Sequence, residues 1–219
     1  MFQKFLTVLV RRFPDVLLAL QEHLLLVLVP IVCAIIVAVP LGILATRYKW
    51  VEKPVLAIGN ILQTIPSLAL LALMIPLGLG IGKKPAMVAL FLYSLLPILR
   101  NTYTGIIGVP RPVKEAALGM GMTTFQRLYI VELPIAFSII MAGIRTATVI
   151  CIGTATLSAL IGGGGLGEFI VTGLNMVRDE LILLGAIPAA LMALLADFLM
   201  GKLEDLVTPR GLKIARQIK

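Results

Sequence analysis

The sequence predicts an all-α integral membrane protein with about five transmembrane helices. Of its 219 residues, 59% are hydrophobic and only 14% are charged, whereas a soluble domain is closer to half apolar and a quarter charged. The apolar residues also form long runs and lack the short alternating pattern of barrel strands. Each run is long enough to cross about 30 Å of hydrocarbon at 1.5 Å per residue, and a helix satisfies its own backbone groups there.

The N-terminal segment, residues 1–21, is of mixed character. Its apolar residues are interrupted by Arg11, Arg12, Pro14 and Asp15, and it lacks the charged, apolar and small-residue order of a cleaved signal peptide. No uninterrupted apolar run in it reaches the length of about 20 residues that a span needs. We expect an interfacial amphipathic segment, with an irregular sixth span as the alternative.

The transmembrane domain is expected over residues 22–208, followed by a basic tail over residues 209–219. Long apolar runs place its five spans at about 23–45, 55–79, 86–109, 135–161 and 181–203. Two features interrupt the spans, namely a polar loop at 110–134 and a glycine-rich segment at 161–175.

Loop charges predict the orientation, because lysine and arginine accumulate in cytoplasmic loops. One set of loops holds more of them than the other, which places the 110–134 loop and the C-terminus in the cytoplasm and the N-terminus outside. The richer set is Arg47, Lys49, Lys53, Arg111, Lys114, Arg127, Lys202, Arg210, Lys213, Arg216 and Lys219; the poorer set is Lys4, Arg11, Arg12, Lys83, Lys84 and Arg178. The net charge of +8 is therefore a topology signal, and no nucleic-acid partner is expected.

The 110–134 loop contains residues that typically start and end short helices. Pro112 fits the first turn of a helix, where no N–H is needed, and residues 115–118 favour helix. Gly119 and Gly121 then loosen the backbone. Thr123, followed three residues later by Gln126, predicts a capping box that starts a second helix, and Pro134 marks the junction with the next apolar run. Two short helices at a membrane face suit a docking element; the plainer alternative is an ordinary amphipathic loop helix.

Placing a polar side chain inside a span costs free energy, so such a residue is expected to have a function or a hydrogen-bonding partner. Candidates for lining a wet pathway are Asn60, Gln63, Thr64, Ser67, Asn101 and Thr102, the first four grouped around Pro66; the alternative is that they are hydrogen-bonding contacts between helices. Arg100, Arg145 and Asp197 lie in the inner half of the bilayer. We expect Asp197 to form a structural ion pair with Arg145 or Arg100.

The glycine run at Gly162, Gly163, Gly164 and Gly165 is not a nucleotide-binding loop. No Lys-Ser or Lys-Thr pair follows it, and the predicted topology places it outside the cell. We expect a tight turn into a short re-entrant helix at about 166–174 that covers the outer mouth of a pathway. His23 is the single histidine, and Cys33 and Cys151 lie in apolar runs, so neither a metal site nor a catalytic site is expected.

The loop resembles the EAA signature of ATP-driven importer permeases, in which Glu-Ala-Ala and a glycine precede Ile-x-Leu-Pro. Glu115, Ala116, Ala117, Gly121, Leu133 and Pro134 match it, and Val131 stands where isoleucine is usual. Further segments are similar to the osmoprotectant branch of this superfamily, which imports glycine betaine, carnitine or choline; they are residues 60–68, 96–105, 141–145 and 162–167.

The resemblance implies a type I importer permease fold in a bacterial cell membrane, with a cytoplasmic coupling helix formed by Glu115, Ala116, Ala117, Gly119 and Gly121. Its implied partners are a cytoplasmic ATP-binding subunit, a second permease subunit (a paralogue or an identical copy), an extracellular or lipid-anchored substrate-binding protein, and membrane lipid. The partner ATPase would bind ATP and Mg²⁺, so this chain would have no cofactor and no catalytic residue. Because only 6% of the chain is aromatic, selectivity for quaternary ammonium groups is expected mainly in the binding protein.

Other functions stay open on sequence alone. A permease of the same superfamily could carry another small solute, such as an amino acid. A secondary transporter would need an internal repeat with matching discontinuous helices, and no convincing repeat is present. A membrane enzyme would need a convergent set of nucleophile, base or metal ligands, which one histidine and two membrane-buried cysteines do not supply.

Overall fold

The computed structural model describes residues 2–207, and this part of the chain contains helices and turns but no strand. The predicted basic tail at 209–219 lies outside the described residues. The helices, in chain order, are α1 (Phe2–Arg11), α2 (Phe13–Arg47), α3 (Lys49–Thr64), α4 (Ser67–Leu73), η1 (Ile75–Leu79), α5 (Lys83–Ile107), α6 (Arg111–Gly119), α7 (Thr124–Gln126), η2 (Arg127–Glu132), α8 (Leu133–Leu157), η3 (Ser158–Ile161), α9 (Gly167–Asn175) and α10 (Asp179–Val207).

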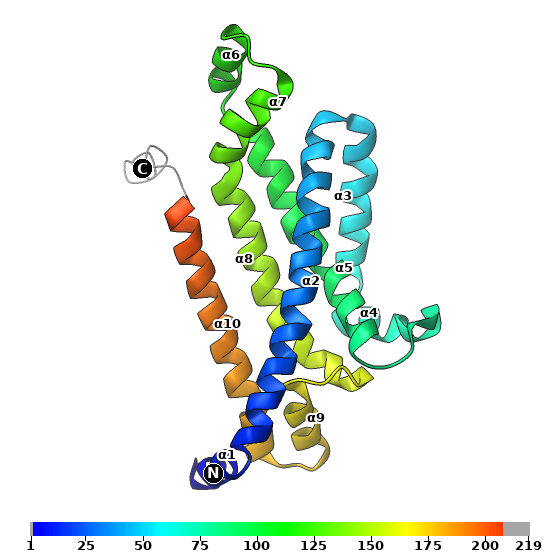
Figure 1. Ribbon diagram of the computed structural model, residues 1–219. Coiled ribbons are helices and arrows are strands. Elements are labelled where there is room, and N and C mark those ends of the chain that lie inside the picture. The colour runs from blue at the N-terminus through cyan, green and yellow to red at the C-terminus, as the bar shows by residue number, and fades with distance from the viewer. Residues whose placement is uncertain (1, 208–219) are drawn as a thin grey trace.

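Four long helices, α2, α5, α8 and α10, form the body of the molecule (Figure 1). Each is long and apolar enough to cross a membrane, and the bent pair formed by α3 with α4 and η1 raises the number of candidate spans in the described chain to five. The main core lies where α5 packs between α2 and α8, around fully buried side chains such as Leu26, Leu90 and Ile98. The predicted fold class and the third, fourth and fifth spans are therefore confirmed.

Small residues bring the core helices close together. A Cβ atom on Gly143 of α8 would lie 2.5 Å from Cβ of Asn101 and 2.8 Å from the carbonyl oxygen of Pro97, both on α5. A Cβ atom on Gly42 of α2 would lie 2.8 Å from Cβ of Thr102. Glycine therefore permits the close helix contacts that are typical of membrane bundles.

The N-terminal part differs from the sequence prediction. The first span begins at Phe13, well before residue 23, because Pro14 lies in the first turn of α2, where its missing N–H has no cost. The expected boundary between residues 21 and 22 therefore falls inside a continuous helix. Only α1 is a separate amphipathic helix, and its Phe5 packs against Leu181 and Leu184 of α10.

The second span is also different, because it is broken. The helices on the two sides of Pro66 are bent by 100°, so the span expected at about 55–79 is two helices separated by a break. Ile65 is extended, with φ −73° and ψ 125°, since the residue before a proline disfavours the helical conformation. α3 therefore runs beside α2, and α4 turns away from the bundle (Figure 1).

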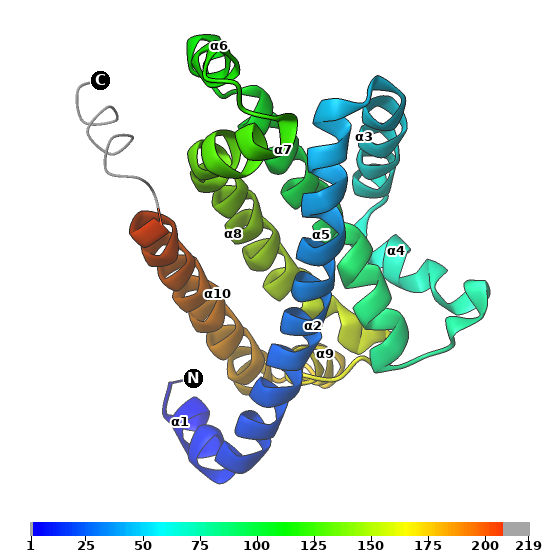
Figure 2. The same ribbon diagram turned by 45° about the horizontal axis from the view of Figure 1, so that its top comes forward.

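Both views show the same distribution of the connections between the two ends of the bundle (Figures 1 and 2). The turn between α2 and α3, the helices α6 and α7, and the end of α10 lie at one end. The helices α1 and α9 lie at the other. This agrees with the grouping of loops that the lysine and arginine distribution predicted.

Candidate functional site

The connection between α5 and α8 carries α6 and α7, which project beyond the ends of the long helices (Figure 1). Pro112 lies in the first turn of α6. The N–H of Gln126 donates to Oγ1 of Thr123 over 3.3 Å, and the N–H of Thr123 donates to Oε1 of Gln126 over 2.9 Å. The predicted capping box is therefore confirmed. Gly121, between the two helices, has φ 76°, a conformation that favours glycine.

The predicted docking residues divide between two roles. Glu115, Ala116, Gly119 and Gly121 are exposed, whereas Ala117 is buried and packs α6 against the rest of the chain. Large apolar side chains beside them are also exposed, among them Met120 and Phe125, and the ring of Phe125 lies 4.4 Å from that of Tyr129. An exposed apolar patch bordered by polar residues is typical of an interaction surface.

A cluster of charged side chains lies at the base of this loop; we name Glu132, Arg47, Arg127 and Lys114 the Glu132 cluster. The Glu132 side chain is only 1% exposed. It accepts hydrogen bonds from Nη2 of Arg47 and from Nε of Arg127, the latter over 3.0 Å. Lys114 of α6 donates to the carbonyl oxygens of Ile106 and Ile107 over 3.0 and 3.3 Å.

The surroundings of Lys114 change the pKa of its ammonium group. Burial lowers the pKa of its ammonium group below the usual range, because a desolvated charge is disfavoured. The nearby guanidinium groups lower this pKa further, whereas the carboxylate of Glu132 opposes them. Burial of Lys114 is therefore the main cause of its lowered pKa.

Sequence reasoning missed Glu132. The available signal was a lone carboxylate between Val131 and Leu133 at the start of an apolar run, and such a residue needs a partner. Its main partner, Arg47, lies 85 residues away along the chain. The sequence therefore marks the acidic residue but not the cation that pairs with it.

The polar residues around Pro66 lie on an uncovered face. Asn60 and Thr64 are exposed, and Gln63 and Ser67 are partly exposed. Thr64 donates to the carbonyl oxygen of Ile61 on its own helix over 2.7 Å, and within residues 2–207 none of the four side chains bonds to another helix. They therefore do not act as contacts between the helices of this chain, and their role in a pathway stays a prediction.

The two pathway candidates on α5 have different surroundings. Thr102 is fully buried, and its hydroxyl donates to the carbonyl oxygen of Ile98 over 2.8 Å. It packs against Gly42, so it makes a close contact between α2 and α5 in this chain, and a role in a pathway stays a prediction. Asn101 is half-buried, with its amide donating to the carbonyl oxygen of Pro97 over 2.8 Å.

Asp197 forms the ion pair that its sequence context predicted. Nε of Arg145 lies 2.5 Å from Oδ1 of Asp197, and Nη2 lies 2.6 Å from Oδ2, so the contact is bidentate. Glu204 is a second, more distant acidic neighbour of Arg145 at 4.0 Å. Arg100, the alternative partner, is exposed and forms no ion pair within the described residues.

The change Asp197→Asn is expected to lower the yield of folded protein several-fold, because it leaves the Arg145 guanidinium without its bidentate partner in the membrane. The double variant Asp197→Asn with Arg145→Gln should recover most of that loss, since no uncompensated charge remains. Size-exclusion chromatography of fluorescently tagged protein measures both. A full yield for the single variant would contradict a structural role for the pair.

The glycine run is folded against the first part of α2 and the start of α5. Gly162, Gly164 and Gly165 have φ values of 75°, 83° and 77°. The N–H of Gly165 donates to Oε2 of Glu22 over 3.2 Å, and Nζ of Lys83 lies 2.7 Å from Oε1 of the same carboxylate. The expected re-entrant helix follows as α9. A role as an outer gate stays a prediction, but the contacts show a tightly held turn.

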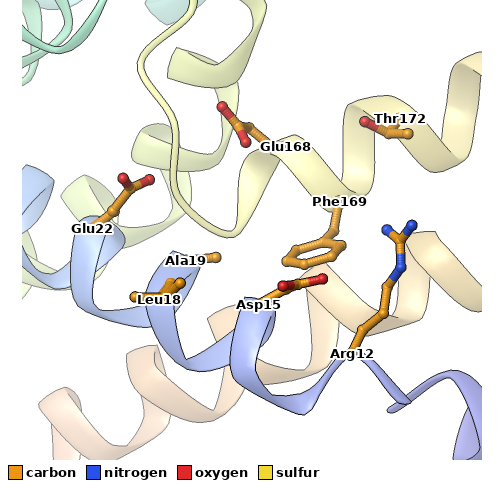
Figure 3. Close-up of a pocket in the computed structure, with 8 residues that line it drawn as sticks. All are labelled: Arg12, Asp15, Leu18, Ala19, Glu22, Glu168, Phe169 and Thr172. Atoms are coloured by element: carbon orange, nitrogen blue, oxygen red, sulfur yellow. The ribbon is translucent and has the colours of Figure 1, made fainter. Parts of the chain in front are cut away.

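A pocket of about 320 Å³ opens beside this turn, between the first part of α2 and α9. Figure 3 shows the ring of Phe169 close to the carboxylate of Asp15, with the guanidinium group of Arg12 nearby. Glu22 and Glu168 contribute further carboxylates to its lining. The pocket offers polar groups at the end of the bundle opposite α6.

No group of three or more histidine, cysteine, aspartate or glutamate side chains with metal-binding geometry occurs in the part of the chain that the structure describes. Cys33 is exposed and Cys151 is buried, and both are free thiols.

Comparison with known families matches residues 38–210 to the binding-protein-dependent transport system inner membrane component family. This range contains α6, the Glu132 cluster and the broken second span. The chain belongs to this family. It is therefore a membrane-embedded transport permease subunit, and the predicted resemblance is confirmed.

Curated relatives match this permease over nearly their whole lengths. It is 52% identical to the glycine betaine/carnitine/choline transport system permease protein OpuCB of Bacillus subtilis, covering 90% of each chain. It is 49% identical to the carnitine transport permease protein OpuCB of Listeria monocytogenes, covering 93% of each. It is 46% identical to the osmoprotectant import permease protein OsmW of Salmonella typhimurium, covering 88% of this chain and 91% of that one.

Solved structures confirm the fold. The permease matches a chain of the inward-facing MetNI methionine ABC transporter with a TM-score of 0.79 and 23% identity, covering 89% of this chain and 96% of that one. It matches a chain of an amino acid ABC transporter with a TM-score of 0.72 and 20% identity, covering 92% and 97%. At these identities the likeness establishes the shared architecture alone.

Proposed function

We infer that this permease is a transmembrane subunit of an ATP-driven importer for osmoprotectants, namely quaternary ammonium solutes such as glycine betaine, carnitine or choline. The observation that carries this conclusion is the identity of about half of all residues, over nearly the full length, with permeases named for these solutes. The chain supplies the translocation pathway, and a separate subunit hydrolyses ATP.

The exposed face of α6 is the docking surface for the cytoplasmic ATP-binding subunit. Glu115 provides a charge there, and Met120, which directly follows α6, and Phe125 of α7 provide apolar contacts beside it. The excess of lysine and arginine at this end of the bundle supports its cytoplasmic location, and that of the C-terminus. ATP and Mg²⁺ belong to the partner subunit.

The pathway lies between this permease and a second permease subunit, identical or paralogous. The uncovered polar face at Asn60, Gln63 and Thr64 supports this arrangement. The bend at Pro66 supports it as well, because a break in a helix at membrane depth must be covered by protein or water. At the opposite end, the turn at Gly162–Gly165 and the pocket beside it face the substrate-binding protein, which delivers the solute.

ATP-dependent uptake into proteoliposomes tests the function. Vesicles would hold the whole complex with its binding protein and would be offered radiolabelled glycine betaine, carnitine and choline, with an amino-acid mixture as the comparison. We expect at least one of the three solutes to accumulate only when ATP is supplied inside. Uptake of amino acids alone would overturn the substrate class, and uptake without ATP would overturn the importer.

A further inference from the structure

Arg100 is a charged residue of the transmembrane helix α5 for which residues 2–207 supply no partner. It is exposed, and its guanidinium group takes part in no ion pair or hydrogen bond within this part of the chain. A charged group inside a span costs free energy unless it pairs with another charge or faces water. Arg100 therefore needs either water or an anion that this part of the chain does not provide.

Helix geometry gives the direction of the Arg100 side chain. Thr102, two residues later, packs on α2, since a Cβ atom on Gly42 would lie 2.8 Å from Cβ of Thr102. Residues two apart on an α-helix point about 200° apart, because about 3.6 residues complete a turn. Arg100 therefore points away from α2.

The neighbours of Arg100 on α5 contact α3 on one side and α8 on the other. A Cβ atom on Gly59 of α3 would lie 2.7 Å from Cδ1 of Leu96, one turn before Arg100. Asn101, the next residue, packs on Gly143 of α8. Arg100 therefore lies at the opening between α3 and α8, on a face of α5 that is uncovered within the described residues.

Other polar side chains border the same opening. Thr104 lies one turn further along α5, and Thr146 lies three residues after Gly143 on α8; both are exposed. Gln63 lies one turn after Gly59, on the same side of α3, and is partly exposed. In a membrane, a face with a charge and several polar side chains is typical of a water-filled pathway. The opening between α3 and α8 therefore suits the pathway inferred above.

We propose that Arg100 holds the carboxylate of the transported solute as the solute crosses the membrane. The proposal rests on the importer function inferred above. A guanidinium group matches a carboxylate with two parallel hydrogen bonds, and glycine betaine and carnitine each carry a carboxylate besides their quaternary ammonium group. Choline has no carboxylate, and its positive charge is repelled by Arg100. The permease therefore recognises the anionic end of the solute, whereas the cationic end is left to the binding protein.

The first measurement asks whether position 100 faces water, and it does not depend on the solute. Arg100→Cys, in a Cys33→Ser background of the complete complex, is treated with a charged, membrane-impermeant methanethiosulfonate reagent, and the mass of the permease reports the modification. Leu199→Cys is the matched control, because Leu199 is exposed and apolar. Both residues lie about two turns before the ends of their helices, α5 and α10. We expect Arg100→Cys to react and Leu199→Cys to stay unmodified.

The second measurement compares solutes in proteoliposomes that hold the complete complex. Arg100→Gln should lower ATP-dependent uptake of glycine betaine and carnitine about tenfold, the effect expected from the loss of a charge-assisted hydrogen bond, and should not lower uptake of choline. Arg100→Lys, which keeps the charge but not the planar donor pair, should lose less than Arg100→Gln. Lys202→Gln is the matched control. It removes the same charge from α10, where Lys202 lies 5.5 Å from the ring centre of Phe198, and should leave uptake unchanged.

Several results would overturn the role of Arg100. They are equal reactivity of Arg100→Cys and Leu199→Cys, equal loss of uptake for choline and for the carboxylate solutes in Arg100→Gln, and transport of choline alone by the unaltered complex. If the complex carries only carboxylate solutes, equal losses in Arg100→Lys and Arg100→Gln overturn it. If Arg100→Gln does not assemble, Arg100→Lys is compared with choline uptake in its place.

The proposed function can fail separately. If the unaltered complex moves amino acids alone, the substrate class is wrong, but amino acids also carry a carboxylate, so the same variants still test Arg100. If it moves none of the solutes, the importer for these solutes is wrong, and the labelling of Arg100→Cys decides whether Arg100 faces a pathway at all.

Discussion

Replacing Glu115 with lysine is expected to abolish ATP-dependent uptake while leaving this permease folded. Glu115 is exposed on α6 and forms no ion pair within residues 2–207, so the change removes nothing from the interior. At the docking surface it reverses a charge, and a like-charge contact across an interface costs several kcal/mol. Since ~1.4 kcal/mol corresponds to a tenfold change in binding, association should weaken at least about tenfold. Co-purification of the ATP-binding subunit and uptake in proteoliposomes measure the loss.

The matched control for this variant is Asp205→Lys. Asp205 is exposed at the same end of the bundle, near the end of α10. Its replacement by lysine changes the net charge by the same amount, but away from the 110–134 loop. We expect it to retain the ATP-binding subunit. If Glu115→Lys bound that subunit and supported uptake as well as Asp205→Lys does, the docking role of α6 would be wrong.

The second large effect is expected at Gly143, where the change to alanine should destabilise the permease by about 1–3 kcal/mol, the usual cost of overpacking a core. The added Cβ would meet Cβ of Asn101 at 2.5 Å and the carbonyl oxygen of Pro97 at 2.8 Å. A backbone oxygen cannot swing aside as the end of a long side chain can, so α5 and α8 must separate. The thermal unfolding midpoint of the purified permease in detergent should fall by several degrees.

Gly153, on the same helix, provides the comparison. No atom lies within 4 Å of a Cβ built there, so Gly153→Ala adds helix propensity without a clash and should stabilise the helix by ~0.5–1 kcal/mol. Equal shifts of the midpoint for the two variants, in the same direction, would show that the contact between α5 and α8 is more adaptable than the structure indicates.

The sequence predicted those parts of the fold that depend on local chemistry. Long apolar runs located α5, α8 and α10, and the spacing of Thr123 and Gln126 identified the cap of α7. The break at Pro66 was not predicted, because a proline inside an apolar run is compatible with a kink or with a full break. Pro30 and Pro40, by comparison, lie inside the continuous helix α2. Packing around each proline decides between these outcomes, and a single sequence does not report it.

Only part of the candidate site was predicted, again because a single sequence does not report packing. The helix α6 has a local sequence signature that predicted its position, and its docking role stays a prediction. The pair of Arg145 with Asp197 was inferred because few charges occur in the spans, which leaves few possible partners. Glu132 was missed, since its role depends on which side of a helix faces the bundle. Long apolar helices carry little amphipathic pattern to show that side.

The glycine turn at the end of the bundle opposite α6 implies a segment with almost no mutational tolerance. Any other residue introduces a side chain, and at Gly162, Gly164 and Gly165 the backbone of that residue would have to adopt a left-handed conformation, at roughly 1–2 kcal/mol for each residue. At Gly163 it would meet Oγ of Ser158 at 2.5 Å. In a population under selection for transport, these four glycines would therefore persist for steric reasons, even if none of them ever touches the solute.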